Sequence, residues 1–247
     1  MNLIKSNSKI IFGSMRMIEY NYSIDYWVDL FKKLFYRGVH IHHVSNEYES
    51  FSLYIIAYNK FKKLYPDYNI KHIVKLAEPH FSDETFSQQR LFDKVSFYLN
   101  KLNSEKLYGI QWMWRSTSPN SKVIEAYNLK ILTIRNAFDK LKENKQIENL
   151  FVFPYFKEFA FATLEADKLN FNFFDGFIVY RNKKEIIFDD ILRTTPKINL
   201  ILRPLFGGKL DNSISPREAI DFSLKIDNVE GAIVSISSLK KLIQLLE

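Results

Sequence analysis

Short apolar runs alternate with longer amphipathic stretches along the 247 residues of the chain. Eight of the runs are rich in β-branched and aromatic residues, as strands are, and they read KIIFG, VHIHHV, KHIVKLA, LYGIQWMW, NLFVFP, GFIVY, INLILR and GAIVSI. Helical patterns separate most of them. Eight strands alternating with helices over this length predict an α/β fold, a single (β/α)8 TIM barrel. A doubly wound sheet is the rival arrangement, but the chain has no GxGxxG fingerprint to support it.

The helical stretches carry their own start signals. Residues 24–37 place apolar side chains on one face at helical spacing. Residues 83–103 follow Ser82, a good N-cap, and SPRE at 215–218 has the form of a capping box. A last helix is expected to begin near Ser238. Because no linker rich in Gly, Pro or Ser interrupts this order, we expect one domain over 1–247.

Composition narrows the classes of function. The chain has no cysteine, which excludes disulfides, thiolate metal sites and cysteine nucleophiles. Hydrophobic residues make up 47% and charged residues 26%, as in ordinary soluble proteins. No apolar run is long enough for a signal peptide or a membrane span. We therefore expect a soluble cytoplasmic protein without a membrane partner. The net charge of +7 comes from scattered lysines, which argues against nucleic-acid binding but is compatible with an anionic small molecule. Nothing predicts the oligomeric state.

In a TIM barrel the carboxyl ends of the strands build the site, so the residues that follow each run are the candidates. They are residues 13–16, 43–48, 75–79, 114–117, 153–155, 180–182, 203–209 and 235–238.

Three of the five histidines fall within GVHIHHV and could form a metal site. On a strand, His40 and His42 face one way and His43 the other. Two histidines on one face can bind zinc, but further ligands at other strand ends are few, since His72 and His80 are the only other histidines. We therefore expect no metal, and we interpret His40 and His42 as packing or lining residues.

Taken in order, the strand ends resemble the aldo/keto reductase family, barrel oxidoreductases that bind NADP(H). The resemblance covers almost the whole chain, and it is carried by IIFGSMRM, RGVHIHHVSNEY, HIVKLAEP, LKENKQIENLFVFP, LILRPLFGGKL and the closing stretch AIDFSLKIDNVEGAIVSISSLKKL. It implies a reductase of an aldehyde, a ketone or a sugar-derived substrate.

The family's catalytic tetrad consists of Asp, Tyr, Lys and His. Matched to this sequence, Tyr48 takes the tyrosine position and Lys75 the lysine position, whereas His43 stands where the aspartate is expected. The tetrad histidine falls on Trp114, or on Arg115 if the register shifts by one. The resemblance thus implies a site in which Tyr48 is the general acid and Lys75 lowers its pKa.

Other positions of the resemblance concern ligands. Phe153, Pro154 and Ile178 stand where the family has a Ser-Asn pair and a glutamine, while Asn182 keeps a neighbouring asparagine. The guanidinium of Arg115 can bind a carboxylate or phosphate through two parallel hydrogen bonds. Trp112 or Trp114 can stack on a flat ligand. The substrate-binding candidates are therefore Trp114 and Arg115.

Backbone amides at the start of the last helix, with the hydroxyls and lysine beside them, would form an anion site. This stretch and the RPLFGGKL loop lie where the family binds the phosphates of its cofactor. The expected cofactor is NADP, and the expected contacts are Gly13, Ser14, Met15, Arg203, Pro204, Leu205, Lys209, Ser235, Ser237, Ser238 and Lys240.

Two other functions remain open. The chain could be a non-redox binding protein that keeps the fold, or an enzyme of different chemistry that acts on a phosphorylated or nucleotide-linked sugar through Arg115 and Arg203.

Overall fold

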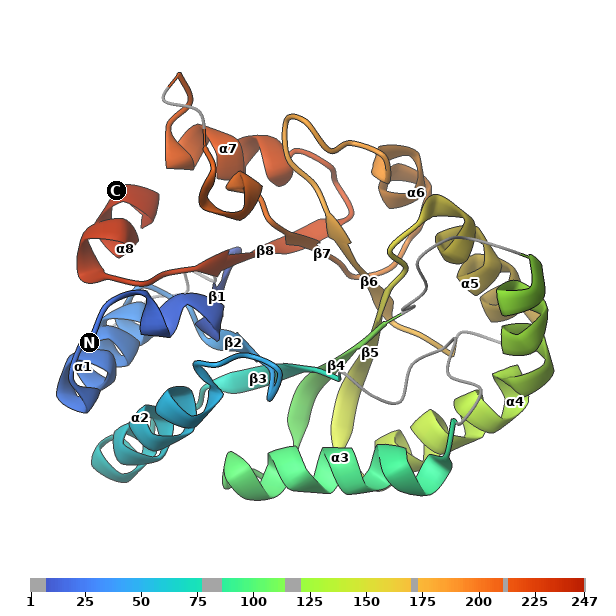
Figure 1. Cartoon of the computed structure of the whole chain (residues 1–247), viewed down its shortest axis with the longest axis horizontal. Helices are drawn as coiled ribbons and strands as arrows, with labels where there is room; N and C mark the ends of the chain where they lie inside the picture. Colours follow the sequence, from blue (N-terminus) through green and yellow to red (C-terminus); the bar gives the residue numbers. More distant parts are fainter. Residues whose placement is uncertain (1–7, 77–85, 114–120, 170–172, 211–212, 247) are drawn as a thin grey trace.

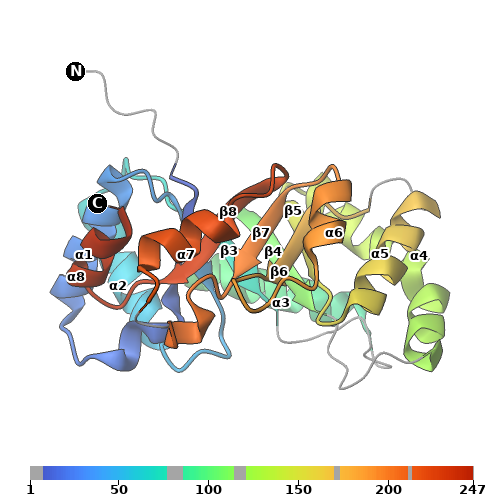
Figure 2. The ribbon, with the colours of Figure 1, turned by 90° about the horizontal axis from the view of Figure 1, so that it is seen from above.

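Eight parallel strands close into a barrel in the order β1-β2-β3-β4-β5-β6-β7-β8. The structure is a computed structural model and describes residues 8–76, 86–113, 121–169, 173–210 and 213–246. Figures 1 and 2 show the helices as an outer ring around the strands. The fold is therefore the (β/α)8 TIM barrel that the sequence predicts, and the doubly wound sheet is excluded.

All eight predicted strands are present, with shifts of a few residues at their ends. Their bounds are Ile10–Gly13 (β1), Ile41–Val44 (β2), Lys71–Lys75 (β3), Leu107–Met113 (β4), Ile147–Phe153 (β5), Gly176–Tyr180 (β6), Asn199–Leu202 (β7) and Val229–Ser235 (β8).

The connecting helices follow the strands in turn. Their bounds are Ile24–Tyr36 (α1), Phe51–Leu64 (α2), Gln88–Lys101 (α3), Ser121–Glu143 (α4), Lys157–Leu169 (α5), Asp189–Thr194 (α6), Pro216–Ser223 (α7) and Leu239–Leu246 (α8), with short 3₁₀ segments at Ser14–Glu19 (η1) and Phe206–Gly208 (η2).

The predicted helix signals agree with the structure except at α3. The Ser23 hydroxyl caps α1 by accepting a hydrogen bond from the Tyr26 N–H, and Ser215 and Glu218 form the expected capping box of α7. Helix α3 begins later than predicted, at Gln88, because its N-cap is Ser87. The predicted cap Ser82 lies outside the described residues.

Two apolar clusters divide the molecule into layers. The smaller cluster fills the barrel interior with inward-facing residues, and its members are Ile11, Ile73, Met113, Phe151, Phe153, Ile178, Leu200 and Ile233. The larger cluster lies between the strands and the helices. Because side chains alternate along a strand, this division decides which residue at each strand end faces the barrel mouth.

Three histidines are buried on β2 and β3. The Tyr54 hydroxyl on α2 lies 2.9 Å from His42 Nδ1 and 2.8 Å from His72 Nε2, so it donates to one ring and accepts from the other. His42 thus packs against the helices, as predicted, while His43 faces the barrel interior. Burial lowers the pKa of His72 to about 3 and that of His42 well below its ordinary value.

No helix among the described residues is both long enough and apolar enough to cross a bilayer. The described part of the chain also contains no group of three or more His, Asp and Glu side chains that could hold a metal ion.

The buried histidines predict a pH-dependent stability. Their pKa is depressed in the folded state, so their contribution is complete above the unfolded value of about 6.5 and is lost as the pH falls below it. Each adds a slope of about 1.4 kcal/mol per pH unit to the free energy of unfolding. Urea denaturation between pH 7 and pH 5 is expected to show this loss, and His72→Gln to reduce the slope. A free energy of unfolding that is flat over this window would contradict the account.

Candidate active site

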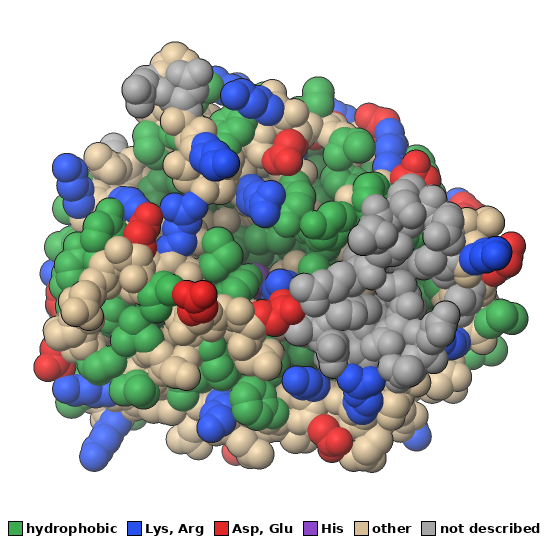
Figure 3. All heavy atoms as spheres, viewed as in Figure 1, with side chains coloured by type: hydrophobic (Ala, Val, Ile, Leu, Met, Phe, Trp, Pro, Cys, Tyr) green, Lys and Arg blue, Asp and Glu red, His purple; other side chains and the backbone are tan. Residues whose placement is uncertain are grey.

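The inward-facing residues at the carboxyl ends of the strands form the floor of the barrel mouth. Figure 3 looks onto this face and shows a hollow near its centre, with a histidine deep inside and basic and acidic side chains beside it. The floor residues, one from each strand, are Gly13, His43, Lys75, Met113, Phe153, Tyr180, Leu202 and Ser235. The structure therefore brings the predicted residues His43, Lys75 and Ser235 to one mouth.

Lys75 forms an ion pair that the sequence analysis did not predict. Its Nζ lies 2.5 Å from Glu47 Oε2, and the two side chains are only 17% and 24% exposed. Glu47 belongs to the turn after β2, four residues beyond the position where the aspartate is expected. A carboxylate thus balances the lysine, although it comes from the turn and not from the strand.

The turn that carries Glu47 is fixed from both sides. The Ser45 hydroxyl donates to the Lys75 carbonyl and accepts from the Glu47 N–H, each at 3.2 Å. The Tyr98 hydroxyl on α3 accepts from the Asn46 N–H at 2.8 Å and lies 3.1 Å from the Lys75 carbonyl. Because these bonds tie the turn to the end of β3, Glu47 is preorganised for Lys75.

His43 contacts a second residue that the sequence analysis did not include. Its Nε2 lies 2.6 Å from Oε1 of Gln111, which is the partner of Lys75 in the β3–β4 register. Burial lowers the pKa of His43 to about 4, and the positive charge of Lys75 acts in the same direction. The ring is therefore neutral at pH 7, and its Nε2–H donates to Gln111. Among the described residues the lysine therefore pairs with Glu47, and the His43 ring pairs with Gln111.

Tyr48 lies beside both groups and is partly buried. Its ring centroid is 5.6 Å from Lys75 Nζ and 6.2 Å from the His43 ring. Burial raises the pKa of Tyr48 well above its ordinary value, and the charge of Glu47 raises it further. The expectation that Lys75 lowers this pKa stays a prediction: in the structure the pKa is raised overall, with burial as the largest cause and Glu47 acting in the same direction.

Aromatic side chains from β5 and β6 form one wall of the mouth. The Tyr180 ring lies 5.0 Å from Phe153 and 6.4 Å from Tyr155. The Arg203 guanidinium lies 4.3 Å from the Tyr180 ring centroid. Tyr155 and Arg203 both have positive φ, at 59° and 55°, which is uncommon for residues other than glycine and which often marks functional sites.

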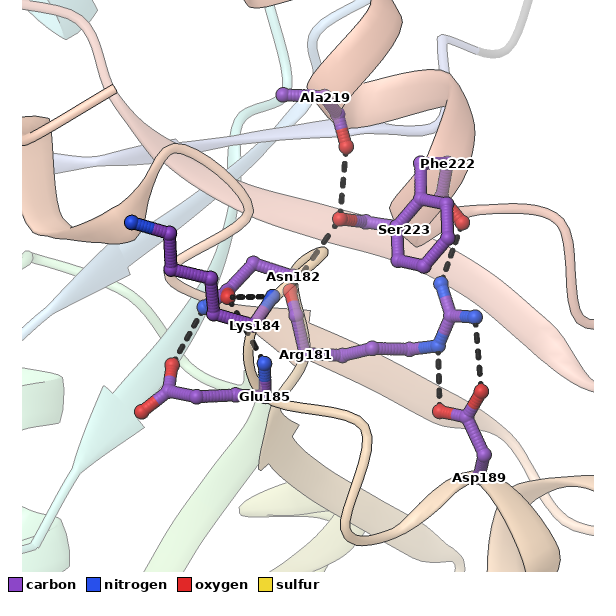
Figure 4. A network of polar contacts seen from close by, with 8 residues as sticks. All are labelled: Arg181, Asn182, Lys184, Glu185, Asp189, Ala219, Phe222 and Ser223. Carbon is purple, nitrogen blue, oxygen red and sulfur yellow. Dashed lines mark hydrogen bonds and ion pairs between the residues drawn. The ribbon is translucent and has the colours of Figure 1, made fainter. Parts of the chain in front are cut away.

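The segment after β6, which follows Tyr180 along the chain, is fixed by a network of polar contacts (Figure 4). Buried Arg181 forms a bidentate ion pair with Asp189, with N···O distances of 2.7 and 3.0 Å, and it also donates to the Phe222 carbonyl. Asn182 donates to the Arg203 carbonyl at 3.3 Å and accepts from two backbone N–H groups of its own turn. Within the described residues Asn182 thus joins the loops after β6 and β7, so these contacts are structural.

The predicted cofactor residues gather at the ends of β1, β7 and β8. Ser14 is buried, and its hydroxyl has no hydrogen-bond partner among the described residues, whereas Met15 is exposed. In the loop after β7, Pro204 is buried, while Arg203 and Lys209 are exposed and Leu205 is partly buried. Ser237 and Ser238 are buried at the start of α8, and Lys240 is exposed.

One of the two tryptophans expected to stack on a ligand lies away from the mouth. Trp112 is fully buried under α4, with its ring 4.8 Å from Phe138, because it faces outward on β4. It cannot stack on a ligand at the mouth, which corrects that expectation. Trp114 and Arg115 lie outside the described residues.

Similar folds occur among solved structures. Two chains described as a putative aldo-keto reductase from Pseudomonas aeruginosa match with TM-scores of 0.70 and 0.69 at 14% identity, over 95% and 97% of this chain and 87% and 88% of theirs. An aldo/keto reductase from Klebsiella pneumoniae, solved with NADP and acetate, matches with a TM-score of 0.68 at 13% identity, over 96% of this chain and 84% of that one. The fold is that of the aldo-keto reductases. No family model and no curated protein matches the sequence.

Within this aldo-keto reductase fold, the sequence analysis missed Glu47 and Gln111. Gln111 had a detectable signal, since it is the one strongly polar residue in the apolar run LYGIQWMW. Glu47 had none, because only the folded turn shows that its carboxylate points to Lys75.

The Lys75–Glu47 ion pair predicts a measurable change in the pKa of Tyr48. Glu47→Gln removes the carboxylate whose charge raises that pKa, so the pKa of Tyr48 is expected to fall toward its ordinary value. Carbon-13 NMR of the tyrosine ring carbons follows the titration, and Tyr48→Phe identifies the signal.

Glu49→Gln is the matched control, because this neighbouring carboxylate is exposed on the same turn. It should leave the titration of Tyr48 unchanged. Equal effects of both variants, or no effect of Glu47→Gln, would show that Glu47 does not act on Tyr48.

Proposed function

We propose that the protein is a nicotinamide-dependent carbonyl reductase in which Tyr48 donates the proton. The observation that supports it most is the meeting of Tyr48, Lys75 and a carboxylate at the mouth of an aldo-keto-reductase-like barrel. These are three of the four types of group in the tetrad that the sequence resemblance implies. The neutral His43 ring supplies the fourth type, bonded to Gln111 on β4.

The residues around the mouth fit a dinucleotide. The buried Ser14 hydroxyl has no hydrogen-bond partner among the described residues, and a bound ligand at the mouth would supply one. Hydroxyls at Ser235, Ser237 and Ser238 and the cation of Arg203 follow β7 and β8, where TIM barrels frequently bind phosphate. A reduced nicotinamide bound here would supply a hydride. One solved relative of the fold carries NADP, which agrees with this choice of cofactor.

The protonation state of Tyr48 decides whether the resting site holds a proton donor or a base at neutral pH. With its pKa raised, the phenol keeps its proton throughout the neutral range and can donate it to a carbonyl oxygen. Oxidation of an alcohol needs a base at the same place, and the phenolate is scarce. The Lys75–Glu47 ion pair lies beside the Tyr48 ring, and the neutral His43 ring, held by Gln111, lies 6.2 Å from it. At neutral pH the resting site therefore holds the acid that the reductive step needs.

A binding protein without redox chemistry is the second candidate. The raised pKa of Tyr48 also favours this candidate. A general acid works best when its pKa lies near the working pH, and the phenol of Tyr48 is a weaker acid than that. The described residues give Arg203 no acidic partner, so an anionic aromatic ligand would suit the mouth.

Tyr48→Phe separates the two candidates. It removes only the hydroxyl, so the rate constant kcat for reduction of a generic aldehyde with NADH or NADPH is expected to fall by about 100-fold or more. Binding of the dinucleotide, measured by calorimetry, should stay within about twofold of wild type, a change below 1 kcal/mol.

Tyr36→Phe is the control, because this tyrosine is exposed at the end of α1, outside the mouth. It should retain full activity. Unchanged turnover by Tyr48→Phe would reject Tyr48 as the acid, and failure of the wild-type protein to bind either dinucleotide at millimolar concentration would reject the reductase.

A further inference from the structure

The region where a barrel usually binds phosphate already holds a carboxylate in this protein. In TIM barrels, phosphate groups frequently bind at the loops after strands 7 and 8 and at a helix N-terminus. Here that region comprises the loop after β7, the start of α8 and the 3₁₀ segment η1. Glu19, the last residue of η1, extends into it.

Glu19 pairs with the cations that a phosphate would need. Lys241 Nζ lies 2.9 Å from Glu19 Oε2 and 2.7 Å from the Ser237 hydroxyl. Arg16 Nη1 lies 3.4 Å from Glu19 Oε1, and another nitrogen of Arg16 donates to the Gly207 carbonyl in the β7 loop. The Ser237 hydroxyl and then Lys241 hold the pKa of Glu19 below its ordinary value, so the carboxylate is ionised at neutral pH.

The amides at the start of α8 are also used by the chain itself. The Lys241 N–H donates to the Ser238 hydroxyl at 3.2 Å, and the Leu239 N–H donates to the Tyr26 hydroxyl at 2.9 Å. The donors that would otherwise receive an anion at this helix end are therefore largely satisfied. Glu19 remains 34% exposed, so a ligand that enters the region would meet its charge.

We propose that Glu19 makes the protein select the dinucleotide without a phosphate on its adenosine ribose, NAD(H), over NADP(H). This inference rests on the proposed function and concerns the cofactor of the same site. A phosphate monoester carries a charge of about −1.5 to −2 at neutral pH. Placed at the start of α8, it is repelled by Glu19 and competes with it for Lys241. A ribose hydroxyl has no such charge, and it can accept or donate a hydrogen bond beside the same carboxylate. The proposal thus replaces the NADP expected from the sequence with NAD(H).

Calorimetric titration of the whole protein with NADH and with NADPH tests the proposal without reliance on turnover. The wild-type protein is expected to bind NADH about tenfold more tightly, and Glu19→Gln to tighten NADPH binding by about tenfold while it leaves NADH within about twofold. The double variant Glu19→Gln/Lys241→Gln should lose the gain for NADPH, because the released lysine is what binds the phosphate. Thermal melting confirms that each variant is folded.

Glu165→Gln is the matched control. Glu165 is paired with Lys168 at 2.9 Å on the surface of α5, so this variant makes the same change in net charge at a distance from α8. It should leave both affinities unchanged.

The outcomes separate the two proposals. Binding of NADPH as tightly as NADH by the wild-type protein, or an equal gain for both dinucleotides in Glu19→Gln, overturns the role of Glu19 and leaves the reductase standing. Binding of neither dinucleotide rejects the reductase and this inference together.

Discussion

The ion pair between Lys75 and Glu47 is the interaction on which the chemistry of the mouth depends. It joins β3 to the turn after β2, and the same turn carries Tyr48. With Glu47 in place the lysine charge is balanced, so burial decides the pKa of Tyr48 and keeps the phenol protonated. The neutral His43 is consistent with this arrangement, since a second positive charge beside Lys75 would be costly in a buried position.

The fold around this pair follows from the order of apolar runs. Each run is too short to be stable alone, and parallel strands need helices on their outer face, so eight alternations leave a closed barrel as the natural solution. Two polar layers interrupt the apolar packing on opposite sides of β2: the His42–Tyr54–His72 contacts toward α2 and the His43–Gln111 contact inside the barrel. The period of two along a strand places them on opposite faces.

The sequence predicted the strands, most helix starts and the positions of Tyr48, Lys75 and His43 at one mouth, because these depend on local pattern and strand order. It did not predict what Tyr48 and Lys75 contact. Glu47 reaches Lys75 only because the Tyr98 hydroxyl, 52 residues beyond Asn46, anchors the turn. Trp112 was expected at the mouth because it is close to a strand end, but its inward or outward direction was set by the register of β4. Glu19 meets Lys241 across 222 residues, and no spacing along the chain indicates such a contact.

The central claim is that Tyr48 is protonated in the resting enzyme throughout the neutral range and donates this proton beside a lysine whose charge Glu47 balances. The most direct test is the pH dependence of aldehyde reduction and of alcohol oxidation with the same dinucleotide pair. The account predicts a reduction kcat that is constant from about pH 6 to pH 9 and an oxidation kcat that rises about tenfold per pH unit, as the phenolate becomes available. A reduction rate that falls with an apparent pKa between about 7 and 9 would show that Lys75 lowers the pKa of Tyr48 after all, and would contradict the account.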